Sequence, residues 1–326
     1  MMTSQALGLA RADRRRALMN SESSLVATKG RIVGQLVGRD HELELVLAAV
    51  DAGRDIVLEG PPGTSKTTML KAITAEWSIP LLFVEGNADL TPAKLVGHHN
   101  PARVLREDYS TANFVPGPLV DAMESGGFLY LEEFNRAPED TLNTLLTAMA
   151  DRKITVPRVG TITARPSFRV IASMNPLDDI GTTRLSTSVH DRLCRLAIGY
   201  QDAEAEQAIV ALRTAPRTAA LAPALRDRLV ADAVAVTRVT RVHPDVRQGS
   251  SVRGAIDCVM VATGLARLRG VVTADDEGYR AVLLDSMIVA LSGRIHLDDA
   301  AQCTPEQILR AIWEEHLLLQ AAAAPG

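Results

Sequence analysis

Aromatic residues are scarce in this sequence: they make up 3% of 326 positions, so the apolar content is almost entirely aliphatic. Single-stranded nucleic acid is usually held by stacking on aromatic side chains, and duplex DNA by basic surfaces. The net charge of −4 offers no general attraction to phosphate backbones or anionic membranes. Composition therefore argues against a nucleic-acid motor, while a hydrophobic fraction of 47% is ample for a core.

Cysteine is also rare, and long apolar runs are missing. The three cysteines are far apart in the chain: Cys194, Cys258 and Cys303. Their spacing fits neither a metal site nor a disulfide framework, which favours a reducing cytoplasm. Residues 281–291 are apolar but contain Asp285, and no run reaches the length of a membrane span. Residues 1–30 lack the apolar stretch of a secretory signal, and we expect a frayed, flexible tail there.

The most informative segment is a loop rich in glycine and proline that connects a β-like run to a helix. Its residues are Gly60, Pro61, Pro62, Gly63, Thr64, Ser65, Lys66 and Thr67. The glycines permit a backbone whose N–H groups point at phosphate oxygens, and the following helix presents its positive dipole end to the same anion. We expect a nucleoside triphosphate here, with Lys66 at its β- and γ-phosphates and Thr67 on Mg²⁺. Ser65 stands where the usual pattern has glycine.

Short apolar runs alternate with helical stretches between residues 31 and 200, which we interpret as one α/β domain. The expected strands are residues 55–59, 81–85, 128–131, 169–174 and 195–198. Such alternation predicts a mainly parallel five-stranded sheet covered on both faces, with its ligand at the carboxyl ends of the strands. Residues 201–326 read instead as an all-helical domain. Its expected helices are residues 202–213, 221–240, 250–269, 276–292 and 305–318.

Polar residues follow two of the expected strands. Glu132 and Glu133 end the run that starts at residue 128. Beside a phosphate loop, one carboxylate would hold the Mg²⁺ shell and the other would orient or deprotonate the attacking water. Taken alone, two glutamates at a strand end would be a solvated edge. Asn175 follows the run 169–174 and could position the same water, although Asn-Pro by itself is only a turn signal.

Taken together, these segments resemble an AAA+ ATPase, and within that superfamily a MoxR-type protein. Residues 60–67 look like the Walker A loop, residues 132–138 resemble the MoxR Walker B run, and residues 174–176 look like sensor 1. Residues 36–39 are similar to the adenine-side motif. Residues 90–97 with 114–119 resemble the clade's insert in the second helix, and residues 152–164 resemble its β-hairpin before sensor 1.

Two further segments carry arginines with roles in that family. Residues 188–193 are similar to the segment with the arginine finger, which places Arg192 in that role, with Arg184 and Arg195 as competitors. Residues 249–253 resemble the sensor 2 motif, with Arg253 as its arginine. Taken alone, any one of these arginines would be interpreted as part of a surface ion pair that contributes little to stability.

The resemblance implies an AAA+ αβα P-loop core followed by an all-α lid, with ATP and Mg²⁺ shared between neighbouring subunits. The implied nucleotide-binding residues are Val37, Gly38, Gly60, Pro61, Pro62, Gly63, Thr64, Ser65, Lys66, Thr67 and Thr68, and the implied metal ligands are Thr67 and Glu132. The implied catalytic residues are Glu133, Asn175, Arg192 and Arg253. A homo-hexameric ring is expected. Its ATPase activity would remodel or activate a client complex in a chaperone-like manner, often with a von Willebrand factor A domain partner.

Two departures from the family pattern bear on turnover. Glu132 replaces the usual aspartate at the metal-side position, and Ser65 replaces glycine. Both favour slow hydrolysis, so a nucleotide-gated assembly scaffold is the second hypothesis and a nucleic-acid motor the third. The client stays open, including the gas-vesicle and Rubisco-activation roles of sister groups.

Overall fold

The computed structural model describes residues 22–107, 111–176, 187–274 and 277–323, and it divides into two compact units. Unit 1 holds Met1–Pro61 and Ser65–Gly199, and unit 2 holds Pro62–Thr64 and Tyr200–Gly326. The boundary between the two units thus falls at Tyr200, next to residue 201, where the sequence predicts the start of the helical domain. Every helix in the described ranges is too short or too polar to cross a bilayer.

Unit 1 is built on a five-stranded sheet in the order β2-β5-β8-β1-β9, and every neighbouring pair is parallel. The strands are β1 (Ile56–Glu59), β2 (Leu81–Glu85), β5 (Phe128–Glu132), β8 (Arg169–Met174) and β9 (Cys194–Ala197). All five expected strands are confirmed, and β9 begins one residue earlier than expected. Because the strands are parallel, their carboxyl ends lie at one edge of the sheet.

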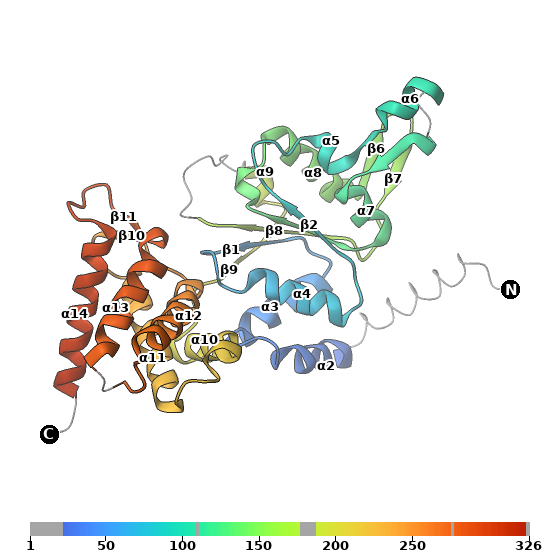
Figure 1. The fold of residues 1–326 in the computed structure, drawn as a ribbon. Helices are drawn as coiled ribbons and strands as arrows, with labels where there is room; N and C mark the ends of the chain where they lie inside the picture. The colour runs from blue at the N-terminus through green and yellow to red at the C-terminus, as the bar shows by residue number, and fades with distance from the viewer. Residues whose placement is uncertain (1–21, 108–110, 177–186, 275–276, 324–326) are drawn as a thin grey trace. The chain divides into compact units, whose positions relative to one another are not determined.

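Helices cover both faces of this sheet (Figure 1). One face packs on α2 (Glu22–Val33), α3 (Asp40–Asp51) and α4 (Lys66–Glu76), and the other on α5 (Pro92–Val96), α7 (Pro118–Ser125) and α8 (Glu139–Asp151). Alternation along β1 supplies both cores, since Ile56 and Leu58 join the first cluster and Val57 the second. Helix α2 lies partly within the expected tail. Its Thr28 accepts a hydrogen bond of 3.1 Å from Trp77 Nε1 at the end of α4.

Two β-hairpins extend from the core of unit 1. Strands β3 (Gly97–His99) and β4 (Phe114–Pro116) pair antiparallel and flank α6 (Pro101–Glu107) and a 3₁₀ turn, η1 (Thr111–Asn113). Strands β6 (Lys153–Val156) and β7 (Gly160–Thr163) form the second hairpin, as expected for residues 152–164. A further 3₁₀ turn, η2 (Phe134–Arg136), follows β5, and α9 (Thr187–His190) precedes β9. Arg152 Nη2 binds the buried Asp55 Oδ2 at 2.7 Å and so ties the second hairpin to the start of β1.

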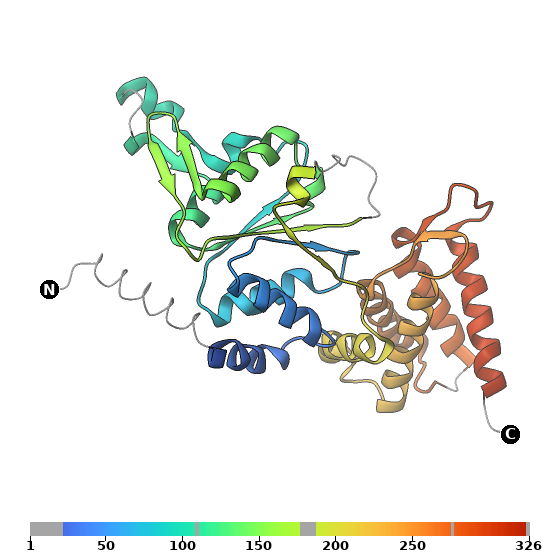
Figure 2. The same cartoon turned by 180° about the vertical axis from the view of Figure 1, so that it is seen from behind.

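The described residues of unit 2 are helical apart from one short β-pair and the connecting loops (Figure 2). It comprises α10 (Ala203–Thr218), α11 (Pro223–Val239), β10 (Val246–Gln248), α12 (Val252–Arg269), α13 (Glu277–Leu291), η3 (Ser292–Arg294), β11 (His296–Leu297) and α14 (Pro305–Ala323). The five expected helices are confirmed. Thr304 and Gln307 form a reciprocal cap at the start of α14, because each backbone N–H donates to the other's side chain. One hydrophobic cluster, mostly aliphatic, runs through all five helices.

Candidate active site

The glycine- and proline-rich loop connects β1 to α4 at the carboxyl edge of the sheet. Its first residue, Gly60, donates its N–H to Met174 O at 3.0 Å, at the end of β8. A Cβ at Gly60 would lie 2.0 Å from Ile198 O, so only glycine fits between the loop and the segment after β9. The loop is therefore hydrogen-bonded to β8 and packed closely against the residue that follows β9.

Ser65 takes a left-handed backbone conformation immediately before α4, with φ 66° and ψ 16°. Residues other than glycine rarely adopt this backbone region, because their Cβ atom makes the conformation about 1–2 kcal/mol less favourable. Glycine is usual at this position because the loop needs a left-handed backbone there. Ser65 keeps that left-handed backbone although it carries a side chain.

Lys66 lies in the first turn of α4 and is only 8% exposed. Its Nζ donates to Gly60 O at 2.7 Å and to Pro61 O at 2.8 Å. The ammonium group thus lies against the inner side of the loop. This is the position from which a lysine can exchange loop carbonyls for the oxygens of a bound phosphate.

The two expected metal-side residues are brought together. Thr67 Oγ1 donates to Glu132 Oε1 at 3.3 Å, which joins the start of α4 to the end of β5. Among the described residues, no cluster of three or more His, Cys, Asp or Glu side chains could hold a metal by itself. Mg²⁺ commonly uses one or two protein oxygens together with substrate phosphates, so Thr67 and Glu132 beside a phosphate loop fit that ion.

Tyr130 also belongs to this group of side chains, although sequence reasoning assigned it only to a buried strand. Its hydroxyl lies 3.2 Å from Thr67 Oγ1, 3.4 Å from Glu132 Oε1 and 3.0 Å from Ser173 Oγ. Two sequence signals could have found it: it stands two residues before Glu132 on the same strand face, and it carries the only polar group among residues 128–131.

Glu133 is the first residue after β5 and has a left-handed backbone, with φ 55° and ψ 41°. Its Oε2 forms an ion pair of 2.9 Å with Arg136 Nε in the following 3₁₀ turn. The loop after β2 passes close by, because Gly86 N donates to Glu132 O at 2.7 Å. A Cβ on Gly86 would lie 2.2 Å from Glu133 O, so this approach also requires glycine.

Asn175 follows β8 directly and is 8% exposed. Since β8 lies between β5 and β1 in the sheet, Asn175 stands between the acidic pair and the phosphate loop in strand order. The carboxyl edge therefore collects a loop with a lysine, two carboxylates and an amide. This set can bind a phosphate chain and hold a water molecule beside it.

The expected arginine finger and its competitors differ in their surroundings. Arg192 is exposed, and its Nη1 donates to Ser188 O at 2.8 Å within its own turn. Arg195 on β9 is instead hydrogen-bonded through Nε to Glu59 on the neighbouring strand β1. Arg184 lies outside the described residues.

Residues 36–39, which resemble the adenine-side motif, lie in the turn between α2 and α3. Gly38 has a φ of 64°, which explains the need for glycine next to Val37. Arg39 is 2% exposed and donates to Glu42 Oε1 at 2.5 Å and to Gly199 O at 2.6 Å. Sequence reasoning placed this motif but gave Arg39 no role.

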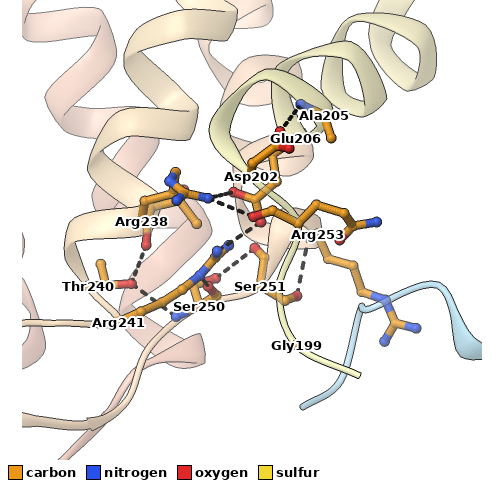
Figure 3. Close-up of polar contacts among 12 residues, drawn as sticks. Gly199, Asp202, Ala205, Glu206, Arg238, Thr240, Arg241, Ser250, Ser251 and Arg253 are labelled. Carbon is orange, nitrogen blue, oxygen red and sulfur yellow. Dashed lines mark hydrogen bonds and ion pairs between the residues drawn. The ribbon is translucent and has the colours of Figure 1, made fainter. Parts of the chain in front are cut away.

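Arg253, the expected sensor 2 residue, lies in the first turn of α12 in unit 2, where its N–H donates to Ser251 Oγ (Figure 3). The loop before it is held by Arg241, whose Nε donates to Ser250 O at 2.7 Å. Arg241 and Arg238 both pair with Glu206, a carboxylate only 1% exposed, at 2.8 and 3.2 Å. Sequence reasoning missed this triad around a buried carboxylate because its members come from separate helices and loops.

Comparison with known proteins gives a family match and distant relatives. Residues 55–193 match the AAA domain family of the dynein-related subfamily. The gas vesicle ATPase GvpN of Ancylobacter aquaticus is 26% identical over 284 residues, which cover 81% of this chain and 74% of that protein. The uncharacterized protein YojN of Bacillus subtilis is 31% identical over 169 residues, but this chain spans only 55% of its length.

Solved structures agree on the fold. The Thermotoga maritima RuvB P216G mutant superposes with a TM-score of 0.51 at 17% sequence identity, over 78% of this chain and 71% of that one. At this identity the likeness concerns architecture alone. The parallel sheet, the phosphate loop between β1 and α4 and the helical second unit agree with that architecture. Residues 55–193 thus match the AAA domain family, and the chain shares the P-loop fold of that structure, with a parallel sheet and a helical C-terminal region.

Proposed function

We propose that this protein is an ATP-hydrolysing, MoxR-type subunit of a ring that remodels a partner protein complex in the cytoplasm. The observation that carries the proposal is the set of polar groups at the carboxyl edge of the sheet. Lys66 and Thr67 open the helix after β1, Glu132 and Glu133 follow β5, and Asn175 follows β8. This is the chemistry that phosphoryl transfer to water requires.

Each residue has a task in such a reaction. Residues 60–67 would surround the phosphates, with Lys66 moving from the loop carbonyls to the β- and γ-phosphate oxygens. Thr67 and Glu132 would hold Mg²⁺, which when bound neutralises phosphate charge. Glu133 would accept the proton of the attacking water, and Asn175 would orient that water. Val37, Gly38 and Thr68 would complete the nucleotide contacts.

In the proposed homo-hexamer, each nucleotide would be shared between neighbouring subunits. The exposure of Arg192, whose Nη1 donates to Ser188 O in its own turn, supports the proposal that it acts on the nucleotide of a neighbour. Arg195 is engaged with Glu59 inside its own sheet and is the weaker candidate. Arg253 would act from the lid of the same subunit.

One observation favours the scaffold alternative, in which ATP is bound and scarcely hydrolysed. Glu133, the proposed base, is ion-paired with Arg136 at 2.9 Å. A carboxylate held by a guanidinium group is less available to a water molecule. Turnover would then depend on release of this pair by a neighbouring subunit or a client.

The proposed client is a protein assembly, acted on together with a von Willebrand factor A domain protein. The sequence likeness to a gas vesicle ATPase makes a gas-vesicle assembly one candidate. A nucleic-acid motor is disfavoured by the net charge of −4, and DNA-stimulated hydrolysis would revive it. The client can be trapped by co-purification with the Glu133→Gln variant, which should bind ATP without turning it over.

The deciding experiment compares ATP binding and steady-state phosphate release in the wild type, Glu133→Gln and Lys66→Ala. We expect wild-type hydrolysis, ATP binding without hydrolysis in Glu133→Gln, and weakened binding in Lys66→Ala. If wild type and Glu133→Gln bind ATP equally and are equally inactive, the enzyme proposal fails and the scaffold remains. If the wild type binds no ATP, both fail.

A further inference from the structure

Tyr130 stands in the middle of β5 and is fully buried. Side chains two residues apart on a strand share a face, so Tyr130 and Glu132 both face the layer that contains α4. The phenol ring packs edge-on against Phe83 of the neighbouring strand, with ring centroids 5.7 Å apart. Its hydroxyl reaches the carboxyl edge of the sheet, where Thr67 opens α4.

The hydroxyl meets three partners from three elements. It lies 3.2 Å from Thr67 Oγ1 on α4, 3.4 Å from Glu132 Oε1 at the end of β5, and 3.0 Å from Ser173 Oγ on β8. An ionised carboxylate can only accept hydrogen bonds, so Tyr130 donates to Glu132 and can accept a bond from Ser173.

We propose that Tyr130 is a positioning residue that sets the Glu132 carboxylate and the Thr67 hydroxyl for Mg²⁺. This inference rests on the proposed function of the site. Tyr130 itself touches neither metal nor nucleotide in the proposal; it acts through the two oxygen ligands. Partners of this kind commonly change metal affinity by about ten- to hundredfold when removed.

Tyr130 also explains how glutamate serves where the family pattern has aspartate. Glu132 is one methylene longer, and a longer side chain has more rotamers to restrict. The phenol donates to one carboxylate oxygen, Oε1, and the same oxygen accepts from Thr67. The two bonds hold the end of the flexible chain at Thr67, where an aspartate would need no such support.

The test measures ADP affinity by calorimetry across a Mg²⁺ series and in EDTA, using the full chain. Tyr130→Phe removes only the hydroxyl and keeps the ring in the core. We expect its ADP affinity in EDTA to equal that of the wild type, while the Mg²⁺ concentration for half-maximal tightening rises about tenfold. Ser173→Ala should raise it by a smaller factor. Tyr200→Phe, a hydroxyl removed at the start of unit 2, should leave it unchanged.

A double-mutant comparison separates positioning from packing. Against a Glu132→Asp background, Tyr130→Phe should change the Mg²⁺ requirement less than about twofold, because the shorter carboxylate is withdrawn from the phenol.

A Tyr130→Phe protein with the wild-type Mg²⁺ requirement overturns the assignment and leaves the proposed function standing. Equal loss of ADP affinity with and without Mg²⁺ also overturns it, in favour of a packing role. If the wild type binds no ADP at any Mg²⁺ concentration, the proposed function itself fails. Should Tyr130→Phe not fold, Ser173→Ala alone decides by the same criteria.

Discussion

Glu133 and Arg136 form an ion pair of 2.9 Å within a single 3₁₀ turn, and the backbone of Glu133 is left-handed with a φ of 55°. The proposed base is thus held by a residue of its own loop. Arg136 is also part of the run that resembles the family's Walker B segment. The guanidinium group of Arg136 therefore lies beside Glu133 whenever this segment adopts the turn seen here.

Removing this cation should speed basal hydrolysis. In Arg136→Gln, the Glu133 carboxylate no longer shares its oxygen with a guanidinium group, so water can occupy that position. We expect steady-state phosphate release to rise several-fold, on the order of 1 kcal/mol in the barrier. Arg103→Gln, an exposed arginine on α6, is the matched control and should have the wild-type rate. A rate that falls in Arg136→Gln would mean that the pair supports catalysis instead.

The finger role of Arg192 can be tested by mixing inactive subunits. Arg192→Ala should bind ATP but release little phosphate, because charge in the transition state of the neighbouring site is no longer stabilised. Glu133→Gln subunits keep Arg192, so adding them to Arg192→Ala subunits should restore part of the activity. Arg195→Ala should remain largely active, since its partner is Glu59 in its own sheet. The absence of recovery on mixing would speak against a shared site.

The conformation of Ser65 predicts an asymmetric response to substitution. Ser65→Val places a β-branched side chain at a φ of 66°, and we expect a loss of about 1–2 kcal/mol in the free energy of unfolding. Ser65→Gly should be no less stable than the wild type, because relief of this strain offsets the added freedom of the unfolded chain. Urea unfolding followed by circular dichroism provides the measurement. Equal stabilities of the two variants would show that the loop relaxes freely.

Two glycine-to-alanine substitutions should change the stability of the fold in opposite directions. Gly60→Ala puts a Cβ 2.0 Å from the backbone oxygen of Ile198, and we expect a loss of about 2 kcal/mol and weaker ATP binding. Gly264 lies inside α12 with nothing within 4 Å of an added Cβ, so Gly264→Ala should gain about 0.5–1 kcal/mol. Thermal unfolding of both variants gives the comparison. A stable, ATP-binding Gly60→Ala protein would contradict the close contact.

Asp232 predicts a stability contribution that depends on pH. Burial by itself would raise the pKa of this carboxyl, but hydrogen bonds with His316, Arg228 and Tyr279 outweigh burial and hold the pKa below its ordinary value of 3.8. The ionised form is therefore favoured by folding, and the contribution is complete above about pH 3.8 and lost as the pH falls through the lowered pKa.

Asp232→Asn should accordingly cost about 3 kcal/mol at pH 7. The difference in unfolding free energy between this variant and the wild type should shrink as the pH falls below about 4. Asp257→Asn removes an exposed pair with Arg294 and should change stability by less than about 1 kcal/mol. Unfolding free energies at several pH values decide the matter, and a difference that stays constant down to pH 3 would rule out the ionised network.

The sequence could predict what is encoded locally. The phosphate loop, the acidic strand end and Asn175 are local patterns. Short apolar or β-branched runs located the five sheet strands, and stretches rich in Ala, Leu, Val and Arg located the five helices of unit 2. Helix α2 was missed as a continuous helix because its apolar positions lie next to a segment rich in Ser, Ala and Arg.

Contacts between distant residues had no such signal. Tyr130 reads as one more core residue until Thr67 and Ser173 are seen beside its hydroxyl. Glu206 reads as a surface residue of an amphipathic helix, yet two arginines bury it. Pairings of this kind depend on how separate elements pack, and packing is specified by the whole fold rather than by one segment.

The contact between Arg39 and Gly199 joins positions 160 residues apart in the chain. Arg39 adjoins the Val37–Gly38 turn, and Gly199 is the last residue of unit 1 before the chain continues into unit 2. A displacement of that turn would therefore act directly on the last residue of unit 1 through a single guanidinium group. One side chain thus connects the turn expected to face the adenine base with the end of unit 1.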